Sequence, residues 1–132
     1  MSSKDKFTGS GKENGEQIWP DGSKYIGEFF DGLPNGQGTY FWPDGDKYVG
    51  QWIMGKRSGL GIHTRSNGTT YIGEFKDNQP HGQGTYIGLD GSTYVGDWKN
   101  GEQHGEGTLT DKNGKITYSG PWLEGKPKNI LN

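Results

Sequence analysis

One spacing, 23 residues, recurs along almost the whole chain and limits what it can fold into. Turn-forming Asx-Gly pairs keep this spacing from Asp21-Gly22 to Asn113-Gly114. Four tyrosines keep it as well: Tyr25, Tyr48, Tyr71 and Tyr94. A unit of this length cannot bury a hydrophobic face by itself, so neighbouring copies must stack and share one continuous core.

Each unit contains two short segments with the alternation typical of strands. In the first complete unit they are residues 25–29 and 36–41, followed by a turn at residues 42–45. Pro43, Asp44 and Gly45 are residue types that tight turns favour. The shorter loop of each unit needs a residue that tolerates a left-handed backbone, and the copies place these residues there: Gly32, Gly55, Asn78, Gly101 and Gly125. The sequence therefore predicts a run of antiparallel hairpins.

The composition requires a thin fold. Glycine supplies 26 of the 132 residues, alanine is absent, and hydrophobic residues make up 27% of the chain. So little apolar volume cannot fill a core of several layers, and the glycine content disfavours long helices. We predict an all-β protein of about ten strands, built as an open, single-layer antiparallel sheet of successive β-hairpins, elongated and twisted.

Period-two alternation puts a tyrosine column and a glycine column on one face of this sheet. Rings that lie over the bare glycine backbone of the neighbouring strand can replace an ordinary core. The residues predicted to have this structural role are Tyr25, Tyr48, Tyr71, Tyr94, Tyr118, Gly27, Gly50, Gly73, Gly96 and Gly120. The last tyrosine comes one residue late, which predicts a strand bulge between Gly114 and Tyr118.

The sequence pattern resembles the MORN (membrane occupation and recognition nexus) repeat. The matching pattern is Tyr-x-Gly-x-aromatic, a glycine-bearing loop and then Gly-x-Gly-x-aromatic, found at residues 25–40, 48–63, 71–86 and 94–109. His63 and Leu109 depart from the aromatic residue at its last position. The resemblance implies a twisted sheet of hairpins, curved so that one face is an aromatic-lined groove.

The second aromatic column, which lies nearer the shorter loops than the tyrosine column, is predicted to line a binding groove, because a one-layer sheet has no second layer to cover it. Pure packing of these rings as core is the alternative. The predicted partner-groove residues are Phe29, Tyr40, Trp52, His63, Phe75, Tyr86, Trp98 and Trp122. We predict a non-enzymatic interaction or scaffold module that accepts a segment of a partner protein, with an amphipathic helix as the expected occupant. The resemblance favours this role, since similar repeats act as scaffolds for cytoskeletal and motor partners.

Two other functions are open at this stage. The resemblance implies membrane attachment through phosphoinositide headgroups, for which Lys56, Arg57 and Arg65 are the candidate anion contacts. The net charge of −2 gives this reading little support. Glycan binding is the other alternative, with sugar faces stacked on exposed Trp52, Trp98 and Trp122.

The sequence predicts no catalytic residue, no cofactor and no metal. His81 and His104 fall at equivalent loop positions, about 10 Å apart, which is too far for both to ligate one ion. Carboxylate residues recur at the same position of successive repeats, whereas a catalytic acid-base pair requires residues that differ from their copies in the other repeats. Basic and acidic residues are interleaved, which excludes the positive field of a nucleic-acid binder.

The predicted organisation has three parts. Residues 1–17 form an N-terminal cap and a degenerate half repeat, residues 18–123 the repeat sheet, and residues 124–132 a C-terminal cap. Phe7 and Ile130-Leu131 are expected to shield the end strands, and failed capping would permit a homodimer through those strands. The polar N-terminus lacks the apolar run of a signal peptide, so a cytoplasmic location is expected, at the periphery of a membrane or of the cytoskeleton.

Overall fold

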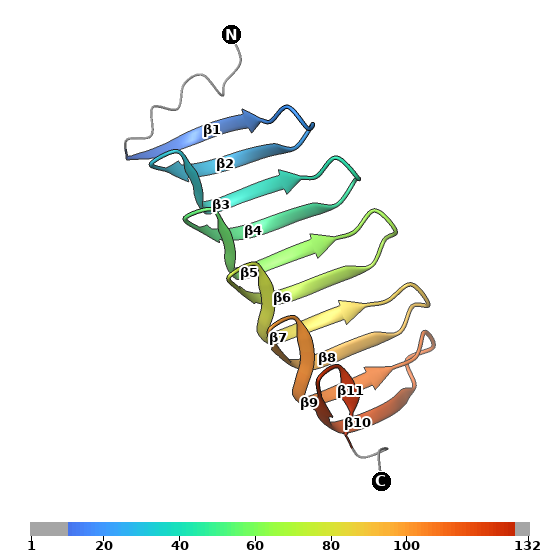
Figure 1. Ribbon diagram of the computed structural model, residues 1–132. Helices are drawn as coiled ribbons and strands as arrows, with labels where there is room; N and C mark the ends of the chain where they lie inside the picture. Colours follow the sequence, from blue (N-terminus) through green and yellow to red (C-terminus); the bar gives the residue numbers. More distant parts are fainter. Residues whose placement is uncertain (1–10, 129–132) are drawn as a thin grey trace.

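A computed structural model describes residues 11–128, which form one open sheet of eleven antiparallel strands (Figure 1). The strands are β1 Lys12–Ile18, β2 Lys24–Phe30, β3 Leu33–Phe41, β4 Lys47–Ile53, β5 Lys56–Thr64, β6 Thr70–Lys76, β7 Gln79–Ile87, β8 Thr93–Lys99, β9 Glu102–Thr110, β10 Ile116–Leu123 and β11 Lys126–Pro127. They follow one another in space in the order of the sequence. The predicted all-β, single-layer fold is confirmed. None of the described residues forms a helix, so none forms one able to cross a membrane.

Two-residue turns, here called short turns, join the strands of each hairpin at one end of the sheet. Asp31 and Gly32, between β2 and β3, have φ angles of 49° and 81°. Positive φ at both central residues is the requirement of a type I′ hairpin turn. Asn78 takes φ 74° at the equivalent position of the third copy, so the prediction from its residue type is confirmed.

Five-residue turns, here called distal turns, join successive hairpins at the other end. In the turn at residues 42–46 the backbone N–H of Asp46 donates to Asp44 Oδ1 at 2.9 Å, and Gly45 has φ 100°. Across the same turn the backbone N–H of Trp42 donates to the carbonyl oxygen of Asp46 at 3.0 Å, and the equivalent backbone bond closes the turns at residues 19–23, 65–69, 88–92 and 111–115. The bulge predicted near Tyr118 is confirmed, because the pairing of β9 with β10 shifts between Ile116 and Tyr118.

The tyrosine column lies over glycine backbone. A Cβ at Gly38 would overlap the Tyr25 ring, and one at Gly84 would overlap the Tyr71 ring. The Tyr25 hydroxyl donates to the carbonyl oxygen of Glu28 at 2.8 Å. The same bond, to the residue three positions later, is made by Tyr48, Tyr71, Tyr94 and Tyr118. Each ring therefore fills the space over a glycine and also satisfies a carbonyl of its own strand.

The second strand of each hairpin, which is β3, β5, β7 or β9, bends where it passes a polar residue in the middle of the preceding strand (Figure 1). Residues 35–37 lie opposite Glu28 alone, and Glu28 Oε2 accepts a hydrogen bond from the backbone N–H of Gln37 at 3.2 Å. Gln51, Glu74 and Asp97 accept the equivalent bond in later copies. Gly36 has φ 102° and lies beside the Glu28 side chain. The recurring acidic and amide side chains thus support the bend.

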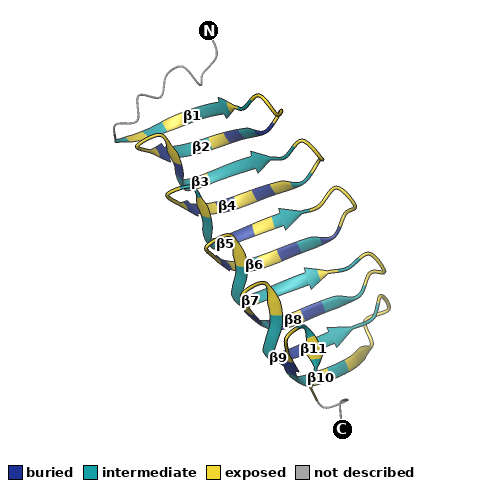
Figure 2. Ribbon diagram, viewed as in Figure 1, coloured by how far each residue is buried: buried dark blue, intermediate teal, exposed yellow. Residues whose placement is uncertain are grey.

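The buried aromatic residues form two columns along the sheet, one of tyrosines and one of phenylalanines and tryptophans nearer the short turns (Figure 2). Four tyrosine rings each meet one aromatic ring of their own strand and one of a later hairpin at nearly right angles: Tyr25, Tyr48, Tyr71 and Tyr94. Tyr48, for example, packs against Trp52 at 85° and against Phe75 at 89°. Edge-to-face contact is a favoured arrangement of aromatic rings. The core is therefore a zigzag of rings, which needs no second sheet.

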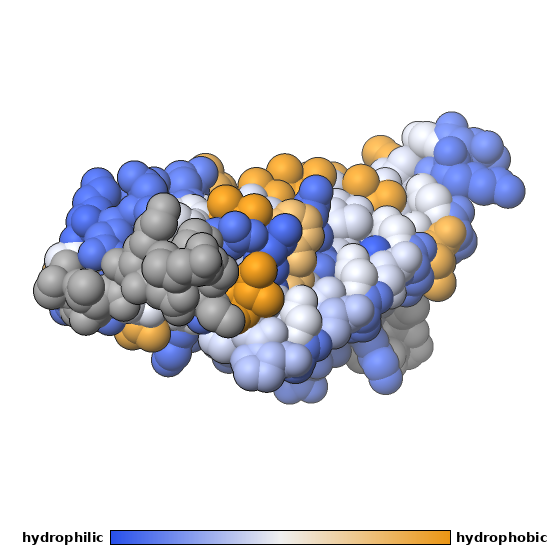
Figure 3. All heavy atoms as spheres, turned by 90° about the horizontal axis from the view of Figure 1, so that it is seen from above, coloured by the Kyte–Doolittle hydropathy of each residue, from blue (hydrophilic) through white to orange (hydrophobic). Residues whose placement is uncertain are grey.

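The opposite face of the sheet carries a cross-strand row of β-branched residues. Ile26, Val49, Ile62, Ile72 and Val95 are between 39% and 51% exposed. Figure 3 shows hydrophobic residues beside hydrophilic ones along one long side of the molecule. Exposed apolar residues are ordinary on a protein surface, and the part of the chain described offers nothing that covers this row.

The sheet reaches beyond residues 18–123, because β1 pairs with β2 and β11 pairs with β10. β1 and β11 are its two end strands among the described residues. Phe7 and Ile130-Leu131, which were expected to shield those ends, lie outside the described residues. A homodimer through the end strands stays a prediction.

Candidate functional site

Five of the eight predicted groove residues are packed in the core. Phe29, Trp52, Phe75, Trp98 and Trp122 are between 1% and 8% exposed. The Trp52, Trp98 and Trp122 indoles also donate to the carbonyl oxygens of Gly38, Gly84 and Gly107. This differs from the expected open stripe, because the bend in each second strand folds the short-turn end over these rings. The three tryptophans are too buried to stack on sugars, which removes the basis of the glycan hypothesis.

The other three predicted groove residues, Tyr40, His63 and Tyr86, are half-buried and lie nearer the distal turns. Trp19 stacks on Tyr40 with centroids 5.5 Å apart, and Trp42 stacks on His63 at 5.4 Å. The N-terminal half of the aromatic face therefore has a partial second layer of indole rings.

A hollow of about 470 Å³ lies on the C-terminal side of this covering layer. Its floor is aromatic and comes from β6, β7 and β8, with Phe75, Tyr86 and Trp98 among its rings. Residues near the short turns and from the distal turn at 65–69 form its sides. The complete lining is Arg57, His63, Arg65, Thr69, Tyr71, Phe75, Asn78, Gln79, Pro80, Tyr86, Trp98, Gly101 and Gln103.

The hollow opens at the point where the covering tryptophans stop. Residues 19, 42 and 65 are equivalent by the 23-residue period, and the first two are tryptophan whereas the third is Arg65. Since each of these tryptophans stacks on the ring 21 positions later, a tryptophan at position 65 would cover Tyr86. Arg65 stands there instead, and both Arg65 and Tyr86 line the hollow.

Arg57 enters the hollow from the start of β5. Its guanidinium lies over the rings of Trp42, Tyr48 and Phe75, at 5.4 to 5.9 Å from their centroids. Its Nε donates to Asn78 Oδ1 at 3.3 Å. Burial lowers the pKa of Arg57, because removal from water disfavours the charged form. Among residues 11–128 it forms no ion pair.

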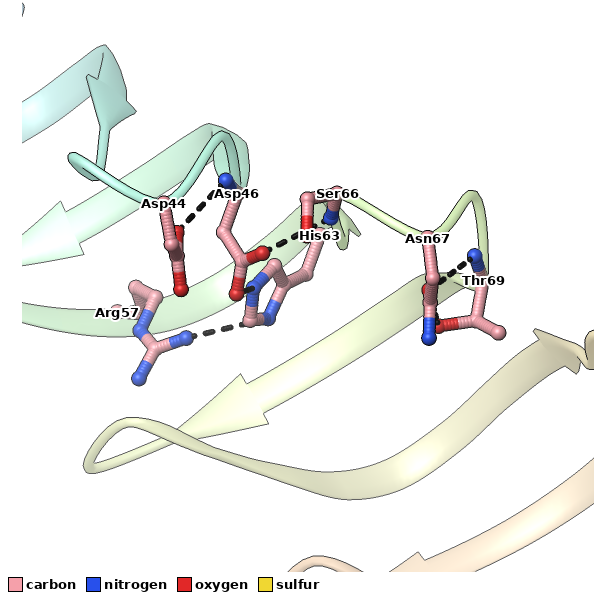
Figure 4. A network of polar contacts seen from close by, with 7 residues as sticks. All are labelled: Asp44, Asp46, Arg57, His63, Ser66, Asn67 and Thr69. Carbon is pink, nitrogen blue, oxygen red and sulfur yellow. Dashed lines mark hydrogen bonds and ion pairs between the residues drawn. The ribbon is translucent and has the colours of Figure 1, made fainter.

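His63 lies between a cation and an anion (Figure 4). Its Nδ1 is 3.4 Å from Arg57 Nη1, and its Nε2 is 3.9 Å from Asp46 Oδ2. Asp46 also accepts a hydrogen bond from the backbone N–H of Ser66 at 2.9 Å. Burial, and then the Arg57 charge, lower the pKa of His63 despite the opposing effect of Asp46. The imidazole is therefore neutral near pH 7, and a neutral ring can accept from Arg57.

The predicted anion contacts divide into two groups. Arg57 and Arg65 line the same hollow, although they stand near opposite ends of β5. Lys56 is exposed and takes no part in the lining. No group of three or more potential metal-ligating side chains occurs among residues 11–128.

Several lining residues were not predicted to belong to a site, notably Asn78, Gln103 and Thr69. Asn78 carried a signal, because it breaks the glycine pattern of the short turns. Gln103 carried one as well, since it replaces the proline found at positions 34 and 80. Trp42, which covers His63, was interpreted only as a turn residue.

A single-layer sheet of stacked hairpins, with a half-open aromatic face and no helix in its described part, defines a repeat protein of the kind that presents a surface to other molecules. The chain belongs to the MORN repeat family, whose pattern matches residues 25–47, 48–70, 71–93 and 94–116. This is a family of non-catalytic repeat modules that generally act in protein or membrane interaction. Membership supports a general role in interaction or as a scaffold. A search of curated proteins found no match.

Proposed function

We propose that the chain is a non-enzymatic interaction module that binds a segment of a partner protein in the hollow on its aromatic face. The observation that carries this proposal is the opening at Arg65, where the aromatic layer loses the indole cover that it has over Tyr40 and His63. Aromatic side chains and arginine are the residues that most often dominate protein interfaces.

An amphipathic helix suits this site better than an extended strand. The hollow is bounded on two sides by turns and has an aromatic floor, so an apolar stripe could rest on the rings while polar residues meet the sides. β-Augmentation would instead require a free strand edge, and β6, β7 and β8 each pair on both sides.

Membrane attachment through a phosphoinositide headgroup is the second candidate. It is favoured by the convergence of Arg57 and Arg65, whereas Lys56 lies elsewhere. The cytoplasmic location, at the periphery of a membrane or of the cytoskeleton, belongs to both candidates and stays a prediction.

A displayed library of helical peptides tests the first candidate. Peptides selected on the wild-type protein are measured by fluorescence anisotropy against Tyr86→Ala and Ile87→Ala, two neighbours on β7. Tyr86 lines the hollow, while Ile87 points to the other face and is 37% exposed. We expect Tyr86→Ala to weaken binding about ten-fold or more and Ile87→Ala to leave it unchanged.

The reverse pattern, or an equal loss in both variants with both folded by circular dichroism, would contradict binding in the hollow. Phosphatidylcholine vesicles with and without a phosphoinositide provide the second arm. Binding only to the phosphoinositide vesicles, with no peptide selected, would replace the first candidate by the second.

A further inference from the structure

Building on the proposed function, we propose that the hollow is specific for an acidic partner segment, whose Asp or Glu carboxylate pairs with the guanidinium of Arg57. Arg65 adds a second positive charge to the same hollow. The partner of this protein is thus identified by chemistry: a peptide with an apolar stripe and one carboxylate placed to reach Arg57.

The first support is where the repeat pattern breaks. Arg57 stands where two other copies have proline, Arg65 stands where two have tryptophan, and His63 stands where two have tyrosine. All three departures fall in the repeat at residues 48–70, and all three side chains line one hollow. The fourth repeat departs at the same three positions, with Gln103, Leu109 and Asp111, but it places no cation there. Because the other copies form the same sheet without a cation at these positions, the two arginines of the second repeat are better explained by a ligand than by the fold.

The second support is the charge of the lining. It contains two arginines and neither Asp nor Glu, in a protein whose net charge is −2. The acidic groups that act on His63 are Asp46 and Asp44. The Asp46 carboxylate accepts from the backbone N–H of Ser66 and faces His63, and Asp44 Oδ1 accepts from the backbone N–H of Asp46. The hollow therefore offers positive charge to an incoming group without an internal counter-ion in its lining.

The third support is the state of the Arg57 guanidinium. A guanidinium has five N–H donors. Arg57 uses its Nε towards Asn78 and one Nη1 donor towards His63. The remaining donors have no protein acceptor among the described residues, and aromatic rings on three sides hold the group in place. A carboxylate accepts two parallel bonds from such a fork, and it would compensate a charge that is now partly desolvated.

A peptide carboxylate fits the site better than a lipid phosphate. The rings beside Arg57 suit apolar peptide side chains, and the wall contributed by Asn78 and Gln103 adds amide groups that can bond a peptide. The overall charge of −2 would oppose approach to an anionic leaflet, where attraction scales with the number of basic residues.

The test compares two variants with the same change in net charge. Arg57→Gln installs the residue that the fourth repeat carries at position 103, and Lys56→Gln alters the exposed neighbour. Peptides are selected from the displayed library on wild-type protein, and each selected acidic residue is also replaced by its amide. A third variant, Arg65→Trp, fills the hollow with the residue found at positions 19 and 42.

We expect the selected peptides to share one acidic position. Arg57→Gln and the amide peptide should each lose about ten-fold or more in affinity, and the two losses should not add. Lys56→Gln should bind like the wild type, and Arg65→Trp should abolish binding while the protein stays folded.

Three results would overturn the proposal. Selected peptides without an acidic position, bound equally by Arg57→Gln, would remove the carboxylate and leave the proposed peptide-binding function intact. Peptides that bind Arg65→Trp as well as the wild type would remove the hollow and the proposed function together. Inorganic phosphate or phosphoinositide vesicles that bind in an Arg57-dependent manner, with no peptide selected, would make the site a phosphate site.

Discussion

The hollow and the repeated columns of buried aromatic rings and glycines, here called the frame, belong to the same sheet. They differ in whether their polar side-chain atoms have hydrogen-bond partners within the protein. In the frame every tyrosine ring covers a glycine and donates its hydroxyl to a carbonyl of its own strand. In the hollow Arg57 keeps donors without a protein acceptor, and His63 Nε2 is buried without a hydrogen-bond partner among the described residues.

This difference separates stability from recognition along one face. Buried polar groups are nearly always paired where their only role is to hold a fold. The frame obeys this rule in each copy. In the described part of the hollow one buried atom, His63 Nε2, breaks this rule, and His63 is also a residue at which the sequence period breaks.

The largest expected effect is on the frame. Trp98→Ala should lower the free energy of unfolding by about 3–5 kcal/mol, because it empties a buried site and frees the Gly84 carbonyl. Urea unfolding followed by circular dichroism measures the loss. The partly exposed Trp42 provides the matched control, and Trp42→Ala should cost clearly less. Similar losses of unfolding free energy for the two variants would show that Trp42 is as tightly packed as Trp98, and that the frame and the covering layer do not differ in this respect.

A smaller effect is expected from one hydroxyl. Tyr71→Phe leaves the Glu74 carbonyl without its 2.8 Å bond, which should cost about 1–2 kcal/mol of unfolding free energy. Tyr86→Phe is the control, because the Tyr86 hydroxyl has no hydrogen bond among the described residues, and it should be nearly neutral. Chemical denaturation of both variants at one pH makes the comparison, and a neutral Tyr71→Phe would mean that the hydroxyl bond is not part of the frame.

The hollow should make stability depend on pH. Because the pKa of His63 is lowered on folding, the unfolded chain takes up a proton first as the pH falls below about 6.5, and stability decreases. The decrease should reach at most about 1.4 kcal/mol for each pH unit below that value, until the folded protein is protonated too. Asp46 opposes this trend, and Arg57 and Arg65 reinforce it.

His63→Tyr, the residue that positions 40 and 86 carry, isolates this contribution. Unfolding free energies at about pH 7.5 and about pH 5.5 should differ more in the wild type than in the variant. Parallel pH profiles would show that His63 is not held neutral by its surroundings.

The smallest expected change is a gain. Arg65→Trp extends the indole cover over Tyr86 and should raise stability by about 0.5 kcal/mol, in the range usual for cavity filling. Thermal unfolding detects it, with Arg65→Gln as the control for loss of charge alone. If Arg65→Trp lowers the stability, an indole ring does not fit over Tyr86 in the way that indoles cover Tyr40 and His63.

Much of the frame could be predicted from the sequence because its signals are local and repeated. The type I′ turns follow from Gly32 and Asn78, and the bulge follows from the late Tyr118. The part played by Glu28 in supporting the bend could not be predicted, since a carboxylate that recurs with the period looks the same whether it is solvated or bonded to a backbone N–H.

The candidate site was predicted only in part. The sequence selected Arg57, Arg65, His63 and Tyr86, but it also selected Trp52 and Trp122, which are buried and do not line the hollow. Alternation places a side chain on a face and cannot tell how far a bent neighbouring strand will cover it. Lys56 and Arg57 are adjacent in β5 and therefore point to opposite faces, so Lys56 is exposed whereas Arg57 enters the hollow.

The 23-residue period, the hairpins and the face on which the rings lie follow from the amino-acid sequence alone, because turn residues and alternation act over a few residues. Which rings are covered, and which arginines line the same hollow, is settled by contacts that form between the strands. Those outcomes depend on the pairing of β5 with β6 and on the bend of β5, which together bring Arg57 within reach of His63 and open the space beside Arg65. The amino-acid sequence does not show how the strands register and bend, and these features decide which side chains of the sheet come into contact.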